Sequence, residues 1–164
     1  MKANNSDNPE KADKAAVFKN GALIHLIGTM DELNAHIGLI KAKITGKNEY
    51  KGENGKEFIE SIQKNLMKIM AHSSDIANER YFLTQAEITE LERKINNLQK
   101  YLPNQFVLPG ETEIEAYIHI ARTVARRAER QFVAAATEKP LCFYAGTYLN
   151  RLSDYLFALA CMSA

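Results

Sequence analysis

Hydrophobic residues recur at three- and four-residue steps along most of this chain, which is the spacing of amphipathic helices. The first run predicts a helix from about Ala22 to Ile44, with an apolar stripe at Leu26, Met30, Leu33, Ile37, Ile40 and Ile44. A polar, glycine-containing loop over residues 46–55 separates it from a second predicted helix, whose apolar positions are Phe58, Ile62, Leu66, Ile69 and Ile76. Each stripe needs a partner, so the helices are expected to pack together.

A Thr-x-x-Glu sequence predicts the start of a third helix. Thr84 with Glu87 forms a capping-box pattern, in which each residue satisfies a backbone N–H of the other. The apolar positions that follow continue until Pro103 and are Ile88, Leu91, Ile95, Leu98 and Leu102.

The same pattern recurs at Thr112 and Glu115, where it predicts a fourth helix. Pro140 separates that helix from a fifth, which begins at about Cys142 and directs inward Leu149, Leu152, Leu156 and Leu159. No segment alternates as a strand would. The predicted fold is therefore all-α, a bundle of five helices.

The first residues of the chain lack this periodicity. Residues 1–16 are polar, charged and interrupted by Pro9, so a mobile polar arm is predicted over residues 1–18. Residues 19–164 are expected to form a single helical domain, because 164 residues with 46% hydrophobic content suffice for one core.

Charge and cysteine content exclude several classes of protein. Twenty-one basic and twenty acidic side chains leave a formal charge of +1, too little for a general nucleic-acid-binding or membrane-binding surface. The two cysteines, Cys142 and Cys161, lack CxxC spacing, and no signal peptide or long apolar run precedes them. We therefore expect a cytoplasmic protein with reduced thiols and neither nucleic acid nor membrane as a partner.

Four arginines and a glutamate cluster in the fourth predicted helix. At about 100° per residue, Arg122, Arg126, Glu129 and Arg130 fall within roughly a third of the helix circumference, whereas Arg127 points elsewhere. Guanidiniums on one stripe repel one another unless an anion lies between them, and their planar donors suit a polyphosphate. Glu129 is placed to hold one of them. The alternative is a solvated face with i,i+4 ion pairs.

The histidines give no support for a metal site. None of the four follows a glutamate by three residues, so a di-iron centre is not expected, and we predict no metal held by the protein alone. Glu32 with His36, and Glu115 with His119, are i,i+4 pairs that we interpret as contacts on a helix face. His119 is retained as a neighbour of the arginine site.

A second group of polar residues lies in the first predicted helix. Asp31, Asn34 and Gly38 share one side and are poor helix formers, which indicates close approach to another chain or to a ligand. An exposed polar stripe with a packing glycine explains the same spacing. Asn150 and Asp154 in the last helix leave the same two interpretations open.

Four motifs together resemble the PduO-type ATP:cob(I)alamin adenosyltransferases. They span roughly residues 19–160, and the arginine-rich motif is the signature of that family. In chain order they are Gly28-Thr-Met-Asp31-Glu32-Leu33-Asn34, Phe106-Val-Leu-Pro109-Gly110, His119-Ile-Ala-Arg122-Thr-Val-Ala-Arg126-Arg127-Ala-Glu129-Arg130 and Tyr148-Leu-Asn150-Arg151-Leu-Ser-Asp154.

The resemblance implies a five-helix bundle that assembles as a homotrimer, with active sites between neighbouring subunits. Asp31 would pair with Arg122 of an adjacent subunit, so the residues implied as catalytic are Asp31, Arg122 and Arg126. The residues implied to bind ATP, chiefly its triphosphate, are Lys19, Arg122, Arg126, Glu129, Arg130 and Asn150.

The implied reaction joins ATP to a corrinoid. Cob(I)alamin, a carbon nucleophile, would attack the ribose 5′-carbon of ATP and form adenosylcobalamin, while arginines and Mg²⁺ stabilise the leaving triphosphate. A reductase and an adenosylcobalamin-dependent enzyme are implied as partners. No nucleophile from the protein is required.

Phe106 matches the aromatic residue that lies beneath the corrin in this family. There it would keep the lower axial position dry and empty, which makes Co(II) easier to reduce to Co(I). We assign Phe106 and His119 to the cobalamin-binding residues. The alternative for Phe106 is a loop anchor that inserts into the core.

The N-terminal segment departs from the family pattern. Members usually carry a Thr-x-x-Gly-Asp-x-Gly-x-Thr stretch followed by a lysine and an arginine, but here no glycine precedes Gly21, and Leu23 stands at the arginine position. Lys19 occupies the lysine position, and Glu111 replaces a common second glycine. Two alternatives stay open: a homologue that binds corrinoid or nucleotide without turnover, as a carrier or regulator, and a helical assembly protein whose arginines make subunit salt bridges.

Overall fold

Five α-helices account for most of the described residues, which are 21–44, 50 and 55–164 of this computed structural model. None of these residues belongs to a β-strand. The all-α prediction is therefore confirmed, while the predicted arm over residues 1–18 lies outside the described residues. The helices are α2 (Ala22–Ile44), α3 (Lys56–Ser74), α4 (Gln85–Leu98), α5 (Glu113–Ala136) and α6 (Phe143–Ser163), with short 3-10 helices η3 (Glu79–Tyr81) and η4 (Gln99–Tyr101) on either side of α4.

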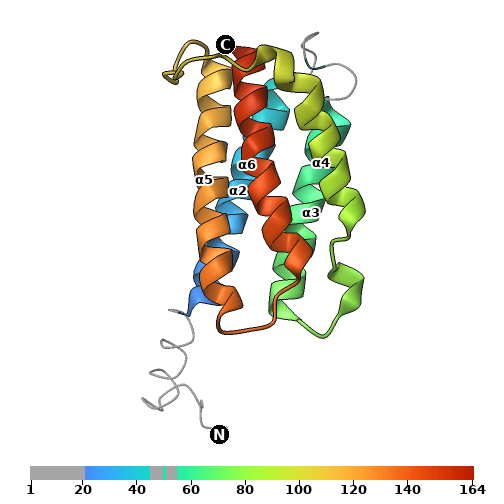
Figure 1. Cartoon of the computed structure of the whole chain (residues 1–164). Helices are drawn as coiled ribbons and strands as arrows, with labels where there is room; N and C mark the ends of the chain where they lie inside the picture. The colour runs from blue at the N-terminus through green and yellow to red at the C-terminus, as the bar shows by residue number, and fades with distance from the viewer. Residues whose placement is uncertain (1–20, 45–49, 51–54) are drawn as a thin grey trace, which may run out of the picture.

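The five helices alternate in direction along the bundle (Figure 1). α5 packs against both α2 and α6, α4 packs against α6, and α3 packs against α2. α4 therefore lies on the far side of α6 from α5. Within the described residues, no helix combines the length and the apolar character that crossing a lipid bilayer requires.

The predicted apolar stripes meet in one core. All six predicted stripe positions of α2 are buried, and α6 contributes the fully buried rings of Tyr148 and Tyr155. Each large aliphatic side chain removed from water contributes about 1.5–3 kcal/mol, so the stripes account for the association of the helices.

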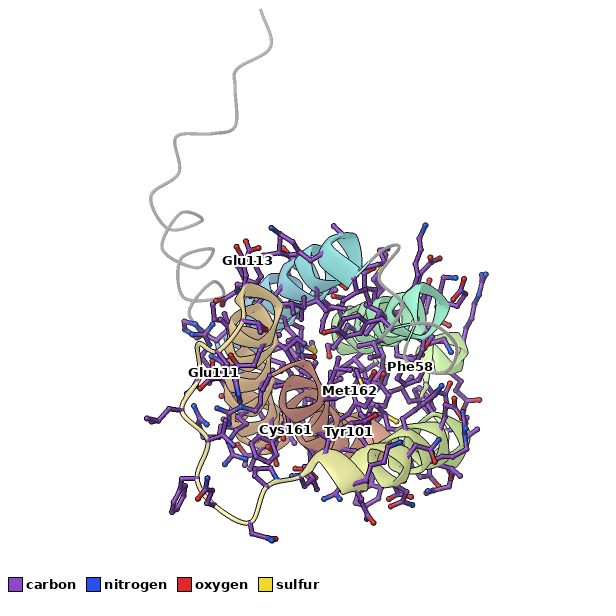
Figure 2. All side chains as sticks on the ribbon, turned by 90° about the horizontal axis from the view of Figure 1, so that it is seen from above. Phe58, Tyr101, Glu111, Glu113, Cys161 and Met162 are labelled. Carbon is purple, nitrogen blue, oxygen red and sulfur yellow. The ribbon has the colours of Figure 1, made fainter. Side chains whose placement is uncertain are left out.

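The connection between α4 and α5, which we call the α4–α5 loop (residues 102–112), crosses the end of the bundle where α6 finishes (Figure 1). Figure 2 looks down on this end and shows the loop running outside the helices between Tyr101 and Glu111. The hydroxyl of Thr112 donates to the carbonyl of Ser163 (2.9 Å), which fastens the start of α5 to the end of α6.

Two predicted helix ends are wrong by a few residues. α3 ends at Ser74 because Asp75 leaves the helical conformation (φ −135°, ψ 78°), so Ile76 lies in the following turn. α4 ends at Leu98, and Leu102 is extended (φ −72°, ψ 123°) and exposed instead of forming the last apolar position. A proline disfavours the helical conformation in the residue before it, which explains the second error.

The two predicted capping boxes differ. At α4 the box is complete, since the Glu87 carboxylate accepts the backbone N–H of Thr84 (2.9 Å) and the Thr84 hydroxyl caps the helix. At α5 the Thr112 hydroxyl accepts the N–H of Glu115 (3.2 Å), but the Glu115 carboxylate accepts the N–H of Gly110 instead (2.7 Å). At α5 the predicted cap by Thr112 is therefore confirmed, whereas the predicted return contact from Glu115 to Thr112 is wrong.

A buried histidine joins α3 to the start of α6. His72 is 2% exposed, and its Nε2 atom accepts the backbone N–H of Cys142, the residue that caps α6 (3.2 Å). Burial lowers the pKa of His72, and the neighbouring Asp75 opposes this shift only in part. The fold therefore requires the neutral ring.

This requirement predicts how stability depends on pH. The folded-state pKa of His72 lies below the unfolded value of about 6.5, so the unfolded state binds more protons and stability is lost as pH falls below that value. The free energy of unfolding, measured by urea denaturation, should be lower at about pH 5.5 than at about pH 7.5. His72→Gln should be less stable at the higher pH but lose less between the two. An equal loss in both proteins would contradict this assignment.

Candidate active site

The arginines of α5 lie on the side of the helix that faces away from the core. Ala121, Ala125 and Ala128 have no exposed surface and form the inner face, with Phe132, 7% exposed, further along it. Arg126 and Arg130 are exposed on the other side, and Arg122 is half-buried. We call these three residues the arginine stripe; it extends about 12 Å along the helix. The predicted division of α5 into an apolar and a charged side is confirmed.

Arg127 points away from the stripe, as predicted. Its guanidinium forms an ion pair with Glu32 of α2, so its charge is matched within the chain. Glu32 also lies 4.0 Å from His36, which confirms the predicted i,i+4 contact on the helix face. Arg127 thus links α5 to α2 and leaves the stripe to the other three arginines.

Within the part of the chain that the structure describes, no acidic side chain forms an ion pair with the stripe. Among the described residues, Arg126 and Arg130 have no acidic partner. The prediction that Glu129 holds an arginine is wrong, because its carboxylate accepts the side-chain amide of Asn150 instead (2.8 Å). Two uncompensated guanidiniums on one exposed face form a local site for an anion.

Asn150 brings α6 to the edge of the stripe. Besides donating to Glu129, it accepts two hydrogen bonds from Arg151 through its Oδ1 atom (2.6 and 3.2 Å). Arg151 also pairs with Asp154 one turn later (3.2 Å). Asn150 is therefore held in a fixed orientation beside Glu129, and the structure brings together these two predicted ATP-binding residues.

A cavity of about 460 Å³ lies at one end of the stripe. It is bounded by α5, by α6 and by the α4–α5 loop, so it joins the predicted corrinoid-binding residues Phe106 and His119 to Arg122 of the stripe. Phe106 is fully exposed, which contradicts the alternative that it anchors the loop in the core. The lining residues are Pro103, Asn104, Gln105, Phe106, Val107, His119, Arg122 and Phe157.

Arg122 is oriented by its neighbours. Its Nε atom donates to Nδ1 of His119 (3.1 Å), and its guanidinium lies 6.0 Å from the ring centre of Phe157. Burial lowers the pKa of His119; the nearby carboxylate of Glu115 opposes this shift, while Arg122 adds to it. The neutral ring accepts from Arg122 at Nδ1, so its proton is on Nε2, which faces Glu115 at 2.8 Å.

One residue of the cavity and the burial of another were missed by the sequence analysis. Phe157 lines the cavity, and its position seven residues after Asn150 and three after Asp154 places it on the same face of α6, a spacing that is visible in the sequence. The predicted i,i+4 contact of Glu115 with His119 is confirmed (2.8 Å), but nothing in the spacing of Glu115 indicates that it is completely buried.

Other predicted residues are not joined to the site within one chain. Asp31 is exposed on α2 and has no ion-pairing partner among the described residues, so its pairing with Arg122 of another subunit stays a prediction. Lys19 lies outside the described residues. Cys142 and Cys161 are free thiols, and neither takes part in the hydrogen bond between Arg122 and His119.

Comparisons of the sequence with known proteins identify similar proteins over most of the chain. A family model described as cobalamin adenosyltransferase matches residues 6–163. The chain is 35% identical over 152 residues to the corrinoid adenosyltransferase of Bacillus subtilis, covering 87% of this chain and 74% of that protein. It is also 35% identical over 150 residues to the corrinoid adenosyltransferase PduO of Citrobacter freundii, covering 88% of this chain but only 43% of that longer protein.

Solved structures give the same result. A variant of a PduO-type ATP:corrinoid adenosyltransferase from Lactobacillus reuteri, complexed with cobalamin and ATP, is similar with a TM-score of 0.78 and 31% identity. The similarity covers 88% of this chain and 81% of that one. A second variant from the same organism, complexed with ATP, has the same TM-score at 32% identity, with 88% and 82% covered.

Proposed function

The chain belongs to the cobalamin adenosyltransferase family, and we propose that it transfers the 5′-deoxyadenosyl group of ATP to cob(I)alamin, releasing triphosphate. The relatives named above are corrinoid adenosyltransferases, and one related structure holds both cobalamin and ATP. The site proposed for this chain comprises Asp31 and Arg122 with Arg126 as catalytic residues, and Lys19, Glu129, Arg130 and Asn150 as further ATP-binding residues.

The observation that carries the proposal is that the cavity opens onto the arginine stripe at Arg122. A polyphosphate fits the uncompensated guanidiniums of Arg126 and Arg130, and a large planar ligand fits beside the exposed ring of Phe106. Two substrates of different chemistry would thus meet at one residue. A carrier of either ligand alone would need only one of these regions.

The chemistry explains why the arginines are needed. The Co(I) electron pair forms the Co–C bond as the C–O bond to the triphosphate breaks, so negative charge develops on the leaving oxygen. Guanidiniums fixed in advance around that position stabilise the charge without reorganisation. Arg122 is fixed in this way by His119 and Phe157. Phe106 would cover the lower face of the corrin and exclude water there.

Mg²⁺ would enter with the nucleotide. Within the described part of the chain, no group of three His, Cys, Asp or Glu side chains could hold a metal ion. Mg²⁺ in proteins commonly keeps several waters and binds through substrate phosphates. We therefore propose MgATP as the substrate form.

A homotrimer is part of the proposal. Asp31 is exposed and has no ion-pairing partner among the described residues of its own chain, as a residue that completes a neighbour's site would be. If Asp31 of one subunit pairs with Arg122 of the next, each active site needs two chains. The exposed α2 face that carries Asp31 would then lie against the stripe of an adjacent subunit.

Removing Arg126 tests the transfer reaction. An anaerobic assay with chemically generated cob(I)alamin and MgATP should show adenosylcobalamin formation by the wild type and a loss of about a hundredfold or more in Arg126→Ala. The melting temperature should change little, because Arg126 is exposed and has no partner among the described residues. Arg93→Ala, which removes an exposed arginine of α4 that pairs with Glu90, is the matched control.

Equal losses in the Arg126 and Arg93 variants would reject the phosphate-binding role. A wild type that binds corrinoid or ATP but forms no product would favour the carrier or regulator instead. Absence of any binding would favour the assembly protein.

Removing Phe106 tests the redox role of the α4–α5 loop. Phe106→Ala should impair adenosylation that starts from Co(II) with a reductant much more than adenosylation from preformed Co(I). Stability should not change, because the ring is fully exposed. Leu108→Ala serves as the control, since Leu108 is an exposed residue of the same loop that does not line the cavity. Equal impairment of both assays would reject the redox role.

Mixed oligomers test the shared site. Asp31→Ala and Arg122→Ala should each be inactive alone, but subunits dissociated, mixed in equal amounts and reassembled should regain about a quarter of wild-type activity. That fraction follows from random assembly, because one site in four then pairs an intact Arg122 with an intact Asp31. No recovery would mean either that both residues belong to the site of one subunit or that the protein is not a trimer. Sedimentation, which measures the oligomeric state, distinguishes these two cases.

A further inference from the structure

Glu115 is a completely buried carboxylate that the proposed reaction does not use. It has no exposed surface, although it lies in the first turn of a helix, where acidic residues are usually in solvent. Its Oε2 atom accepts the backbone N–H of Gly110 at 2.7 Å, and its Oε1 atom lies 2.8 Å from Nε2 of His119. Burial of a carboxylate is costly unless such partners are present, so both contacts are needed at this position.

On one side, Glu115 holds the α4–α5 loop. Gly110 has a φ of +120°, a conformation that favours glycine, and its N–H points at the carboxylate four residues after Phe106. The side chains of Phe106 and Leu108 are exposed and do not anchor the loop in the core. The hydrogen bond to Glu115 therefore fixes the end of the segment that carries Phe106.

On the other side, Glu115 sets the proton of His119. Nδ1 of His119 must be unprotonated to accept from Nε of Arg122 (3.1 Å), which leaves the ring proton on Nε2. A carboxylate 2.8 Å from Nε2 favours this tautomer. Among the described residues, neither Oε1 of Glu115 nor Nε2 of His119 forms a hydrogen bond of good geometry, so the 2.8 Å contact acts through the charge of the carboxylate on the ring.

We propose that Glu115 is a positioning residue that ties the α4–α5 loop to Arg122, through Gly110 on one side and His119 on the other. The proposal rests on the function above, because Phe106 would contact the corrinoid and Arg122 the triphosphate. The tie would set the distance between the two substrates. Reaction rates are sensitive to errors of about 1 Å in such a distance.

Hydrogen–deuterium exchange measures this tie without any turnover. In Glu115→Ala, peptides that cover the α4–α5 loop should exchange faster than in the wild type, while peptides of α2 and α6 stay unchanged. Glu113→Gln is the matched control, because it removes an exposed carboxylate from the same helical turn. Unchanged exchange of the loop in Glu115→Ala, or an equal increase in the control, would overturn the proposal.

Glu115→Gln separates the two sides and guards against misfolding of the alanine variant. Its amide keeps the volume and one acceptor oxygen, which can still accept from Gly110. The NH₂ group then faces His119, moves the ring proton to Nδ1 and places two donors between His119 and Arg122. Loop exchange should stay slow while KM for ATP rises about tenfold or more and KM for corrinoid changes little. Wild-type KM for ATP in this variant would overturn the proposal.

A double variant tests whether Glu115 acts through the loop. Adding Glu115→Ala to Phe106→Ala should raise KM for corrinoid much less than Glu115→Ala does in the wild type, because Phe106 is already absent. Effects that multiply would overturn the proposal.

If the wild type shows no adenosyl transfer, the proposed function fails, but the exchange measurement still tests the tie between Glu115 and the loop. Turnover together with unaltered loop exchange would reject only the tie.

Discussion

The arrangement of the whole bundle depends on α5, which must be a core helix and a carrier of charge at the same time. Its inner face is built from alanines with no exposed surface, so α2 and α6 can both pack closely against it. Arginines cannot be buried without partners, which confines Arg122, Arg126 and Arg130 to the opposite side. Arg127 reaches Glu32 of α2 and is neutralised there. The two requirements fix the rotation of α5 about its axis and therefore the direction of the stripe.

The position of α6 explains why the cavity forms where it does. Because α4 and α5 each pack against α6, the chain must cross the end of α6 to pass from one to the other. The crossing segment is the α4–α5 loop, and it brings Phe106 to the end of the α5–α6 interface. Phe157 of α6 and His119 of α5 close the same space from the helices. A direct α4–α5 contact would have allowed a short turn and left no wall for this cavity.

Membership of the cobalamin adenosyltransferase family accounts for the fold and for the arginines of α5. Turnover depends in addition on the complete site, because one fold can host different functions. Lys19 lies outside the described residues and Asp31 has no ion-pairing partner among them, whereas the stripe lies on one face of α5, where Glu129 accepts from Asn150. Part of the proposed site therefore has to come from the N-terminal residues or from a second subunit. Within the described residues, Glu115 accepts from Gly110 of the loop and lies 2.8 Å from His119, which accepts from Arg122.

The five helices, the charged and apolar sides of α5 and the identity of the stripe follow from the sequence alone, because helical periodicity is a local property of the chain. Local pattern also explains its errors at helix ends, where Asp75 and Pro103 decide the last turn through backbone conformation. Which side chains meet depends on how the helices pack together. Glu129 pairs with Asn150 and not with an arginine, and Phe157 joins Phe106 and Arg122 around one cavity. The Glu115 carboxylate accepts from Gly110 of the loop instead of from the cap of its own helix. Glu115 is completely buried, so its partners are set by the surrounding elements and not by local sequence spacing.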